Sequence, residues 1–243
     1  MKVSLIVPVL NEIKKVDSFL VMLQKMPGDW EILFADGGST DGTLEHLKGK
    51  ARVIACPKGR ARQMNAAARE ATGQVLWFVH CDSLLPQDAY RKIAAAVEGG
   101  AQFGCFTIGF DYDGPFMGCN TYFSNRRAKK GRIAFGDQGI FMTRELFLQQ
   151  NGFPDLPLME DYELSLRMKR QHIPLVVLDS TIITSGRRYQ RRFPLLTMGN
   201  VLAALPLPAG SGPAEDCRHV SGYSIKRKGA STEKVDALFA FSG

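Results

Sequence analysis

The chain has 243 residues, of which 45% are hydrophobic and 23% are charged, and its formal net charge at pH 7 is +7. This length suits one α/β domain with a sizeable core and is short for two, and the composition is that of an ordinary globular protein. No apolar run is long enough to span a bilayer without interruption, which argues against a membrane-spanning helix.

Strands and helices are expected to alternate over the first hundred residues. Continuous apolar runs predict strands at 3–9, 31–35, 52–55 and 75–79. Apolar and alanine-rich helical patterns predict helices at 12–25, about 40–48, a third that ends near 73, and 87–98. Asn11 is the expected N-cap of the first helix, and Thr40 or Asp41 that of the second. With right-handed crossovers, this order predicts an α/β fold with a mostly parallel, Rossmann-like sheet flanked by helices.

The first ten residues resemble a signal peptide only briefly. Charged residues follow where a small-residue cleavage site is needed, so this segment is interpreted as the first strand. After residue 100 we expect strands at 103–110, 139–143 and 175–178, and helices at 116–130, 144–150 and 160–171. From residue 206 the chain is linker-like, which predicts a single domain over 1–205 and a tail of uncertain structure over 206–243.

The apolar run 75–79 leads directly into His80, Cys81 and Asp82. In open α/β sheets, ligands collect at the carboxyl ends of strands, so a carboxylate held there is a candidate for binding a metal or a phosphate. Asp82 is the first such candidate. The alternative is that Asp82 only turns the chain or caps the helix that begins near Gln87.

Three other segments are expected to open at the same edge of the sheet: residues 8–12, residues 36–41 and the basic loop 58–62. A nucleotide diphosphate fits such an edge. Carboxylates or amides can bind its base and ribose, and cations such as Arg60 and Arg62 beside a helix N-terminus can hold its diphosphate. An aspartate can recruit a divalent metal that offsets the diphosphate charge.

Three runs of residues, ADGGSTDGT, HCD and LMEDYELSLRM, carry a resemblance to a known family. They are similar to the VDDGSTDGT run, the DxD-type metal motif and the ED segment of glycosyltransferase family 2, whose enzymes have the GT-A (nucleotide-diphospho-sugar transferase) fold. More narrowly, GRARQMNAAA, GDQGIFM and TSGRRY look like the arsenosugar-biosynthesis-type glycosyltransferase subgroup. The resemblance covers roughly residues 3–192.

The resemblance implies a glycosyltransferase of the hexosyltransferase class, which moves a sugar from a nucleotide-diphosphate donor to a hydroxyl group of an unidentified acceptor. By position it implies nucleotide-sugar contacts at Pro8, Asn11, Glu12 and Asp36, a divalent Mg or Mn ion at Asp82, and Asp161 as the catalytic base. Two residues depart from the family pattern. Gly37 replaces the second Asp of the DDGS run, which leaves the base of the donor open. His80 replaces the first acid of DxD, so metal binding rests on Asp82 with help from the imidazole.

Asp161 is a chemically reasonable base without the family. Glu160 and Asp161 open an expected helix, where the helix dipole favours the charged form of a carboxylate. An inverting transfer needs one such base to take the proton of the attacking hydroxyl, through an oxocarbenium-like state of the kind known in glycoside hydrolysis. The alternative is that both acids only cap the helix.

Two further segments are candidates by family position. The turn GDQG is expected on the acceptor side, with Asp137 and Gln138 available for hydrogen bonds to sugar or hydroxyl groups; an ordinary hairpin turn is the alternative. Arg187 and Arg188 are expected over the diphosphate, where guanidinium groups would stabilise the leaving group. For these two arginines, the alternative is solvated surface.

Cysteine and charge patterns bound the setting. Five scattered cysteines without a CxxC pair argue against a disulfide scaffold and a zinc site, and favour a reducing, cytoplasmic compartment. Basic runs at 126–132, 187–192 and 225–228 leave open a non-catalytic module that binds an anionic membrane surface or nucleic acid. Aromatic residues do not interleave with these runs, so we expect no nucleic-acid partner. The apolar stretch 194–208 leaves room for peripheral contact with the inner face of a membrane.

A different nucleotide-cofactor enzyme is the remaining alternative. The first strand is followed by LNEIKK, which lacks the GxGxxG turn of a dinucleotide-binding oxidoreductase. The acid and glycine run at 36–41 faintly resembles a methyltransferase cofactor loop, but it follows the second strand. The sequence predicts no oligomeric state.

Overall fold

The computed structural model describes residues 1–112 and 117–186. Within these ranges the elements are, in chain order, β1 (Val3–Val9), α1 (Ile13–Gln24), β2 (Trp30–Asp36), α2 (Thr43–Leu47), β3 (Arg52–Ala55), α3 (Arg60–Glu70), β4 (Val75–Phe78), α4 (Ala89–Glu98), β5 (Phe103–Phe110), α5 (Met117–Arg126), a π-helix (Arg127–Gly131), a 3-10 turn (Gly136–Gln138), β6 (Phe141–Thr143), α6 (Arg144–Gln149), α7 (Glu160–Arg170) and β7 (Val176–Thr184). The expected domain boundary near residue 205 lies outside the described residues.

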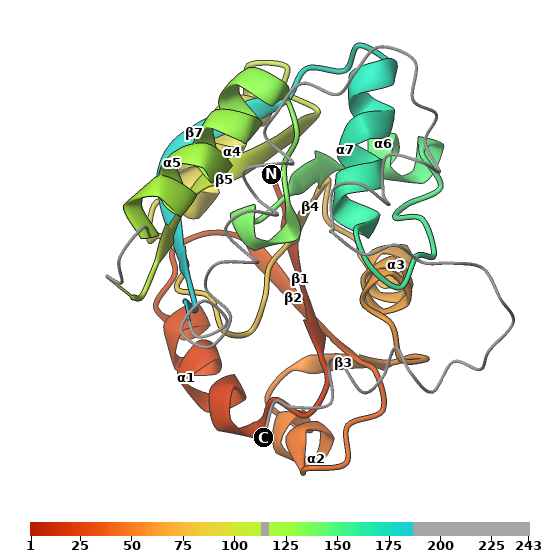
Figure 1. Cartoon of the computed structure of the whole chain (residues 1–243). Helices are drawn as coiled ribbons and strands as arrows, with labels where there is room; N and C mark the ends of the chain where they lie inside the picture. The colour runs from red at the N-terminus through yellow and green to blue at the C-terminus, as the bar shows by residue number, and fades with distance from the viewer. Residues whose placement is uncertain (113–116, 187–243) are drawn as a thin grey trace, which may run out of the picture. The chain divides into compact units, whose positions relative to one another are not determined.

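In the described part of the chain, seven strands form one sheet in the order β3-β2-β1-β4-β6-β5-β7, with helices on both faces (Figure 1). Strand β6 runs antiparallel to β4 and β5, and the other neighbouring pairs are parallel. The mostly parallel α/β sheet predicted from the alternating pattern is therefore confirmed.

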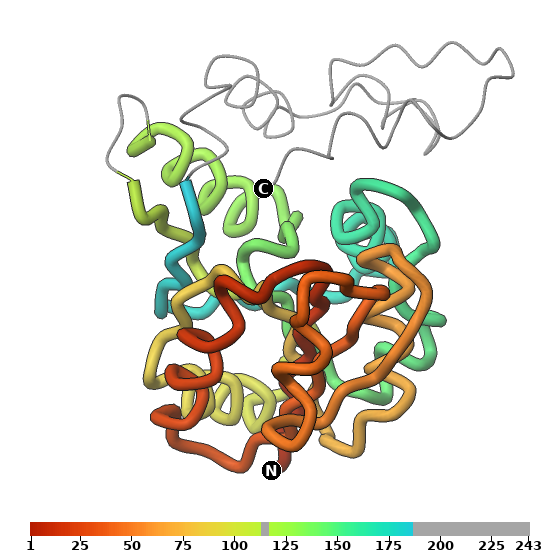
Figure 2. Tube along the Cα trace, turned by 90° about the horizontal axis from the view of Figure 1, so that it is seen from below, coloured from red at the N-terminus to blue at the C-terminus, as the bar shows by residue number. Residues whose placement is uncertain are grey.

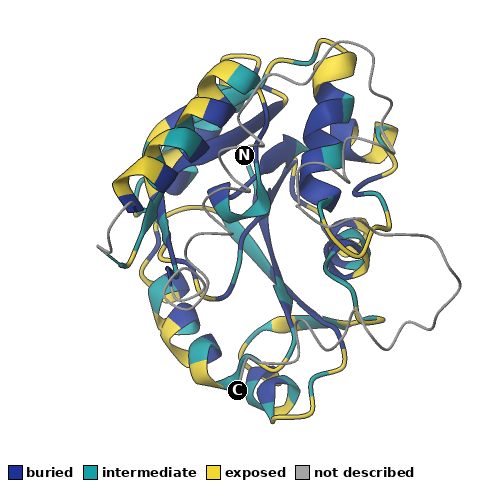
Figure 3. Ribbon diagram, in the orientation of Figure 1, coloured by how far each residue is buried: buried dark blue, intermediate teal, exposed yellow. Residues whose placement is uncertain are grey.

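The sheet separates two apolar cores, because successive residues of a strand point to opposite faces. In β1, Leu5 and Val7 belong to the core under α1 and α4, whereas Ile6 belongs to the core under α3, α6 and α7. Figure 2, turned by 90° from Figure 1, again places α1 on one side of the strands and α6 and α7 on the other. Figure 3 shows the central strands as buried and the outward faces of the helices as exposed. Strands β1 and β4 are covered on both faces, as their continuous apolar runs predict.

Pro8 lies inside β1, a strand with neighbours on both sides. A proline has no N–H to donate to a sheet ladder, so this position needs an explanation. The pairing of β1 with β4 ends at Ile6, opposite Phe78, and the missing N–H of Pro8 therefore falls beyond that ladder. Pro8 lies near the carboxyl end of the strand, as predicted.

The last strand is longer than predicted. The apolar pattern marks only residues 175–178, whereas β7 continues to Thr184. Its register against β5 shifts between Phe106 and Thr107, opposite the polar residues that follow Leu178. This irregularity breaks the apolar alternation, which is why the second half of the strand was missed. None of the helices in the described ranges is long and apolar enough to cross a membrane.

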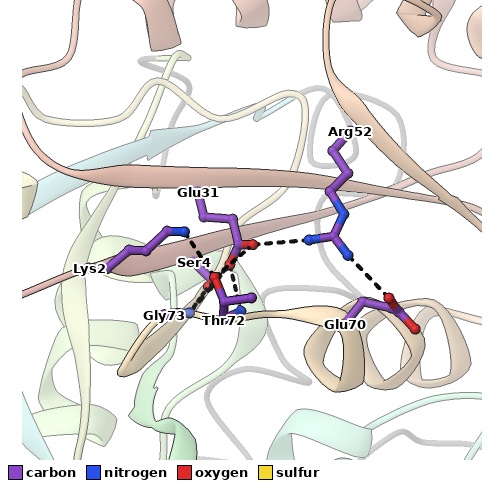
Figure 4. A network of polar contacts seen from close by, with 7 residues as sticks. All are labelled: Lys2, Ser4, Glu31, Arg52, Glu70, Thr72 and Gly73. Carbon is purple, nitrogen blue, oxygen red and sulfur yellow. Dashed lines mark hydrogen bonds and ion pairs between the residues drawn. The ribbon is translucent and has the colours of Figure 1, made fainter.

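Glu31 joins the starts of several strands, at the opposite end of the sheet from the strand ends discussed above. Its Oε2 accepts hydrogen bonds from Ser4 Oγ at 2.5 Å and Thr72 N at 2.7 Å, and its Oε1 accepts from Arg52 Nη1 at 3.0 Å. The Glu31 side chain is only 10% exposed. Figure 4 shows the whole network: Lys2, Ser4, Glu31, Arg52, Glu70, Thr72 and Gly73.

We expect Glu31→Gln to destabilise the fold by about 1–3 kcal/mol at pH 7, the cost of weakening a buried charged hydrogen-bond network. Burial opposes the charge of Glu31, but hydrogen bonds from Ser4 and Thr72 and the nearby Lys2 outweigh it and lower its pKa. A lowered folded-state pKa contributes stability above the unfolded-state pKa, and this stability is lost as pH falls through the folded-state value. Urea unfolding should therefore show a difference that shrinks with acid. A difference independent of pH would contradict the prediction, and the exposed Glu70→Gln serves as control.

Candidate active site

The ends of β1 and β2 form the first part of the site. Asp36, the last residue of β2, is 2% exposed, and its Oδ2 accepts hydrogen bonds from Gly38 N at 3.0 Å and Ser39 N at 3.1 Å. Asn11 has a φ of 57°, in the left-handed region that asparagine tolerates, and its Oδ1 accepts from Thr40 N at 2.8 Å. The loop after β2 is thereby fixed against the end of β1.

The same loop also caps α1. Asp41 Oδ2 accepts from Ile13 N at 3.1 Å, and Thr43 Oγ1 accepts from Glu12 N at 2.9 Å. The N-cap residue of α1 is Glu12, so the expectation that Asn11 caps this helix is wrong. Burial opposes the charge of Asp41, but hydrogen bonds from Thr43 and Ile13 outweigh it and lower the pKa of Asp41. In α2 the N-cap position belongs to Gly42, rather than to Thr40 or Asp41 as predicted.

Gly37 lies against a buried glutamine. A Cβ atom on Gly37 would lie 2.9 Å from Cδ of Gln63, closer than real Cβ contacts come. Gln63, on α3, is 4% exposed, and its Nε2 donates to Val9 O at 2.8 Å and to Ala35 O at 2.9 Å. The amide of Gln63 fills the space that a side chain at position 37 would need, and this packing accounts for the glycine where the family has its second Asp.

Asp82 lies in an exposed turn directly after β4, together with the half-buried His80. It does not cap α4, whose N-cap is Asp88, so the capping alternative for Asp82 is wrong. The thiol of Cys81 is buried, and burial together with the carboxylates of Glu12 and Asp82 raises its pKa to about 12. The ends of β1 and β4 therefore bring Glu12 and Asp82 close to the same thiol, which is not a nucleophile at neutral pH.

His80 and Asp161 line a common small pocket, with Arg60, Gly136, Glu160 and apolar side chains from α3, β4 and the segments around residues 140 and 153. A Cβ atom on Gly136 would lie 3.1 Å from Asp161 Oδ2 and 3.3 Å from His80 Nε2. Both polar side chains therefore lie against the same glycine. Asp82 is not among the residues that line the pocket; it follows two residues after His80.

The carboxylate of Asp161 is held by three donors. Its Oδ2 accepts from Gly136 N at 2.6 Å and lies 3.5 Å from Arg60 Nη2, and its Oδ1 accepts from Tyr162 N at 2.7 Å. The residue before α7, Met159, has a φ of 66°, a left-handed conformation that costs a non-glycine residue about 1–3 kcal/mol. Because Gly136 belongs to a different segment, the contacts of Asp161 go beyond those of a helix cap.

Arg60 and Arg62, the expected diphosphate cations, are both paired with carboxylates. Arg60 Nε donates to Glu160, and Arg62 Nε donates to Asp155 Oδ1 at 2.9 Å. Burial opposes the charge of Arg60, but Asp161 and Glu160 outweigh it and raise its pKa above the usual range. The other two expected cations, at positions 187 and 188, lie outside the described residues.

The segment GDQG forms a 3-10 turn ahead of β6, which differs from the hairpin alternative. Gln138 is fully buried, and its Oε1 accepts from Phe135 N at 3.2 Å and from Arg127 Nη2 at 3.3 Å. The guanidinium of Arg127 lies 3.6 Å from the ring centroid of Phe135. Gln138 therefore supports the turn from inside, while Asp137 is half-buried.

The contacts of α3 were not predicted. Arg60 and Gln63 are three residues apart, a spacing that places both on one face of a helix, and this spacing was the available signal. Their partners lie about 100 and 28 residues away along the chain, at Glu160 and Ala35, and no local pattern specifies them.

No three His, Cys, Asp or Glu side chains in residues 1–112 and 117–186 are grouped so that they could hold a metal ion. Magnesium is commonly held in proteins by one or two carboxylates together with substrate phosphates. The exposed carboxylate of Asp82, with His80 two residues away, fits such an incomplete set, which diphosphate oxygens would complete.

Several solved structures share this fold. A mannosyltransferase from Pyrobaculum calidifontis, in complex with GDP-Man and Mn²⁺, matches with a TM-score of 0.63 and 18% identity, over 83% of this chain and 62% of its own. TarS (residues 1–349) from S. aureus, in complex with UDP-GlcNAc, matches with a TM-score of 0.60 and 19% identity, over 100% of this chain and 74% of its own. Glucosyl-3-phosphoglycerate synthase from Mycobacterium tuberculosis, in complex with Mn²⁺, UDP-Glc and phosphoglyceric acid, matches with a TM-score of 0.59 and 15% identity, over 84% of this chain and 78% of its own.

The chain thus spans 62% of the length of the mannosyltransferase. Among curated proteins, no sequence matches it. The family model for glycosyl transferase family 2 matches residues 4–149, which is more than half of the chain. These residues include the strand ends, α3 and the β4 turn described above. The chain therefore belongs to glycosyl transferase family 2, a family of glycosyltransferase enzymes, and has the GT-A fold.

Proposed function

We propose that this protein is an inverting glycosyltransferase, which moves a sugar from a nucleotide-diphosphate donor to a hydroxyl group of an acceptor. The observation that carries the proposal is the position of Asp161 within a family 2 chain. Its carboxylate shares a pocket with His80, at the end of β4, where open α/β sheets bind ligands.

The donor would lie along the ends of β1 and β2. In this proposal Pro8, Asn11, Glu12 and Asp36 contact the nucleotide-sugar, and they are already held together by the loop that follows β2. Arg187 and Arg188 remain candidates for the diphosphate. Because Arg62 is exposed and its partner Asp155 is also exposed, this arginine can exchange its partner for a phosphate at little cost.

In the chemical step, Asp161 takes the proton of the acceptor hydroxyl as that oxygen attacks the anomeric carbon. The new bond forms opposite the departing nucleotide diphosphate, whose bond to the sugar breaks with inversion. Each oxygen of the Asp161 carboxylate can accept more than one hydrogen bond, so its backbone contacts leave it able to bind a hydroxyl. Asp137, half-buried in the turn beside Gly136, is the proposed polar contact on the acceptor side.

A divalent cation is part of the proposal. The mannosyltransferase and the glucosyl-3-phosphoglycerate synthase were crystallised with Mn²⁺. In this chain Asp82, with His80, would hold such a cation, which when bound would offset the negative charge of the diphosphate. The assignment to the arsenosugar-biosynthesis-type subgroup, a single domain over residues 1–205, a cytoplasmic location and peripheral membrane contact are retained as proposals.

Titration of UDP-, GDP- and dTDP-sugars with Mn²⁺, followed by calorimetry, tests the proposed function. The three structural relatives carry guanosine or uridine donors, so the panel spans both bases and adds a third. We expect one donor to bind more tightly than the others and to lose affinity in EDTA. Absence of binding to every member of the panel would refute the proposal.

With the preferred donor, we expect Asp82→Ala to weaken Mn²⁺-dependent binding at least about tenfold, because even outer-shell partners of a metal ligand are worth 10- to 100-fold in metal affinity. Asp29→Ala is the matched control, since Asp29 is an exposed aspartate just ahead of β2, at the other end of the sheet. Affinity that is the same in wild type and Asp82→Ala would remove Asp82 from the site.

A further inference from the structure

Two adjacent carboxylates at the start of α7 share one cation. The side chains of Glu160 and Asp161 are 2% and 8% exposed, and Arg60 contacts both of them. Carboxylates removed from water are costly unless a positive charge and hydrogen bonds compensate for the lost hydration. Asp137 adds a third negative charge that acts on Arg60. The arginine is therefore the counter-charge of the cluster that contains the proposed base.

Arg60 reaches this cluster from the first turn of α3, a helix on the same side of the sheet as α7 (Figure 1). One turn later on the same face, Gln63 donates to Val9 O and Ala35 O at the ends of β1 and β2. The helix is also clipped to the segment before α7, because Asn65 Nδ2 donates to Phe153 O at 2.8 Å and Phe153 N donates back to Asn65 Oδ1 at 2.9 Å. Helix α3 thus connects the proposed donor edge to the proposed base.

We propose that Arg60 is a positioning residue, which holds Glu160 and Asp161 in place for proton transfer, and that it does not bind the diphosphate of the donor. This inference rests on the proposed function. It differs from the expectation for a basic loop at a helix N-terminus, because the guanidinium already has carboxylate partners on the pocket side. The role of Arg60 is to fix where the carboxylate of Asp161 points.

Loss of Arg60 should act on the chemical step. Without the guanidinium, two neighbouring buried carboxylates repel each other, and Glu160 loses its bonded partner. Asp161 keeps the N–H groups of Gly136 and Tyr162, so its carboxylate shifts rather than leaves the pocket. A displacement of about 1 Å in a reacting group can cost about 10²-fold in rate.

The test compares Arg60→Met and Arg60→Lys with Arg69→Met, an exposed arginine on the same helix that serves as the control. The measurements are kcat and KM with the preferred donor, and calorimetric binding of its nucleotide diphosphate. We expect kcat to fall about 10²-fold in Arg60→Met. Affinity for the nucleotide diphosphate should stay within about twofold of wild type, and Arg60→Lys should recover part of kcat. A tenfold loss of affinity with kcat unchanged would show that Arg60 binds the diphosphate and would overturn the proposal.

A second measurement does not depend on activity. The unfolding free energies of Arg60→Met, Glu160→Gln and the double variant form a cycle. We expect the double variant to lose less stability than the two single changes added together, because each single change breaks the same contact. Strict additivity would overturn the contact itself. If wild type binds no nucleotide, the proposed function fails, while this cycle still decides whether Arg60 holds Glu160.

Discussion

Asp161→Asn should lower kcat about 10²- to 10⁴-fold, the usual contribution of a general base, while nucleotide-diphosphate binding stays close to that of wild type. The amide has nearly the same shape as the carboxylate and can still accept a hydrogen bond from Gly136 N, but it cannot take a proton from the acceptor hydroxyl. The pocket should therefore keep its form and lose its chemistry. Single-turnover transfer and calorimetry measure the two effects separately.

Glu163→Gln is the matched control for this change. Glu163 lies two residues further along α7, is half-buried, and accepts from Arg170 Nη1 at 3.2 Å, away from the lining of the pocket. Its substitution removes one charge from the same helix, so it corrects for the general effect of charge on α7. Turnover in Asp161→Asn equal to that of Glu163→Gln would remove Asp161 as the base and leave the family without its proposed mechanism here.

Trp77→Ala should lower the free energy of unfolding by about 3–5 kcal/mol, the range for removal of a buried aromatic side chain. Trp77 is fully buried in β4. Its ring centroid lies 5.3 Å from that of Trp30 and 5.2 Å from that of Phe106, and its Nε1 donates to Gly139 O at 3.1 Å. The side chain thus supports both the strand that ends at His80 and the turn that contacts Asp161.

Trp77→Phe separates packing from hydrogen bonding. It keeps an aromatic ring but leaves Gly139 O without this donor, so we expect a smaller loss than in the alanine variant. Urea unfolding of both variants gives the comparison. A loss of less than about 1 kcal/mol in Trp77→Ala would contradict the packing described here, because it would mean that the surrounding side chains close the cavity completely.

The fold was predictable because its central strands are buried on both faces. Continuous apolar runs such as 75–79 are typical of parallel strands covered by helices, and the alternation of such runs with helices left few topologies. Strand β6 was placed correctly along the chain, but its antiparallel direction was not predicted. That direction depends on where the chain returns to the sheet, between β4 and β5, and no local signal encodes it.

The site was predictable where it lies at strand ends and not where it depends on distant partners. Asp36 and Asp82 follow apolar runs, and Asp161 opens a helix, so their positions could be inferred from the sequence. The pairing of Arg60 with Glu160 joins residues 100 apart, and only the folded chain brings them together. The same limit explains Gln138, whose polar side chain was expected to face the acceptor and is instead buried on Arg127.

The charge pattern was a weaker guide to partners than the strand ends were. Arg127 belongs to the basic run 126–132, yet its side chain is inside the protein, at 3% exposed, and contacts Gln138 and Phe135. This run is therefore not a continuous basic surface for an anionic partner. The other two basic runs lie outside the described residues.

Gly37 and Gln63 occupy one shared volume, and this has a consequence for comparing and redesigning such proteins. A single substitution that restores the aspartate of the DDGS run would force that side chain into the glutamine amide. The two positions should therefore vary together among homologues, with a smaller residue in place of the glutamine wherever the acid is present. An engineer who wishes to change nucleotide preference here would need to alter both sites at once.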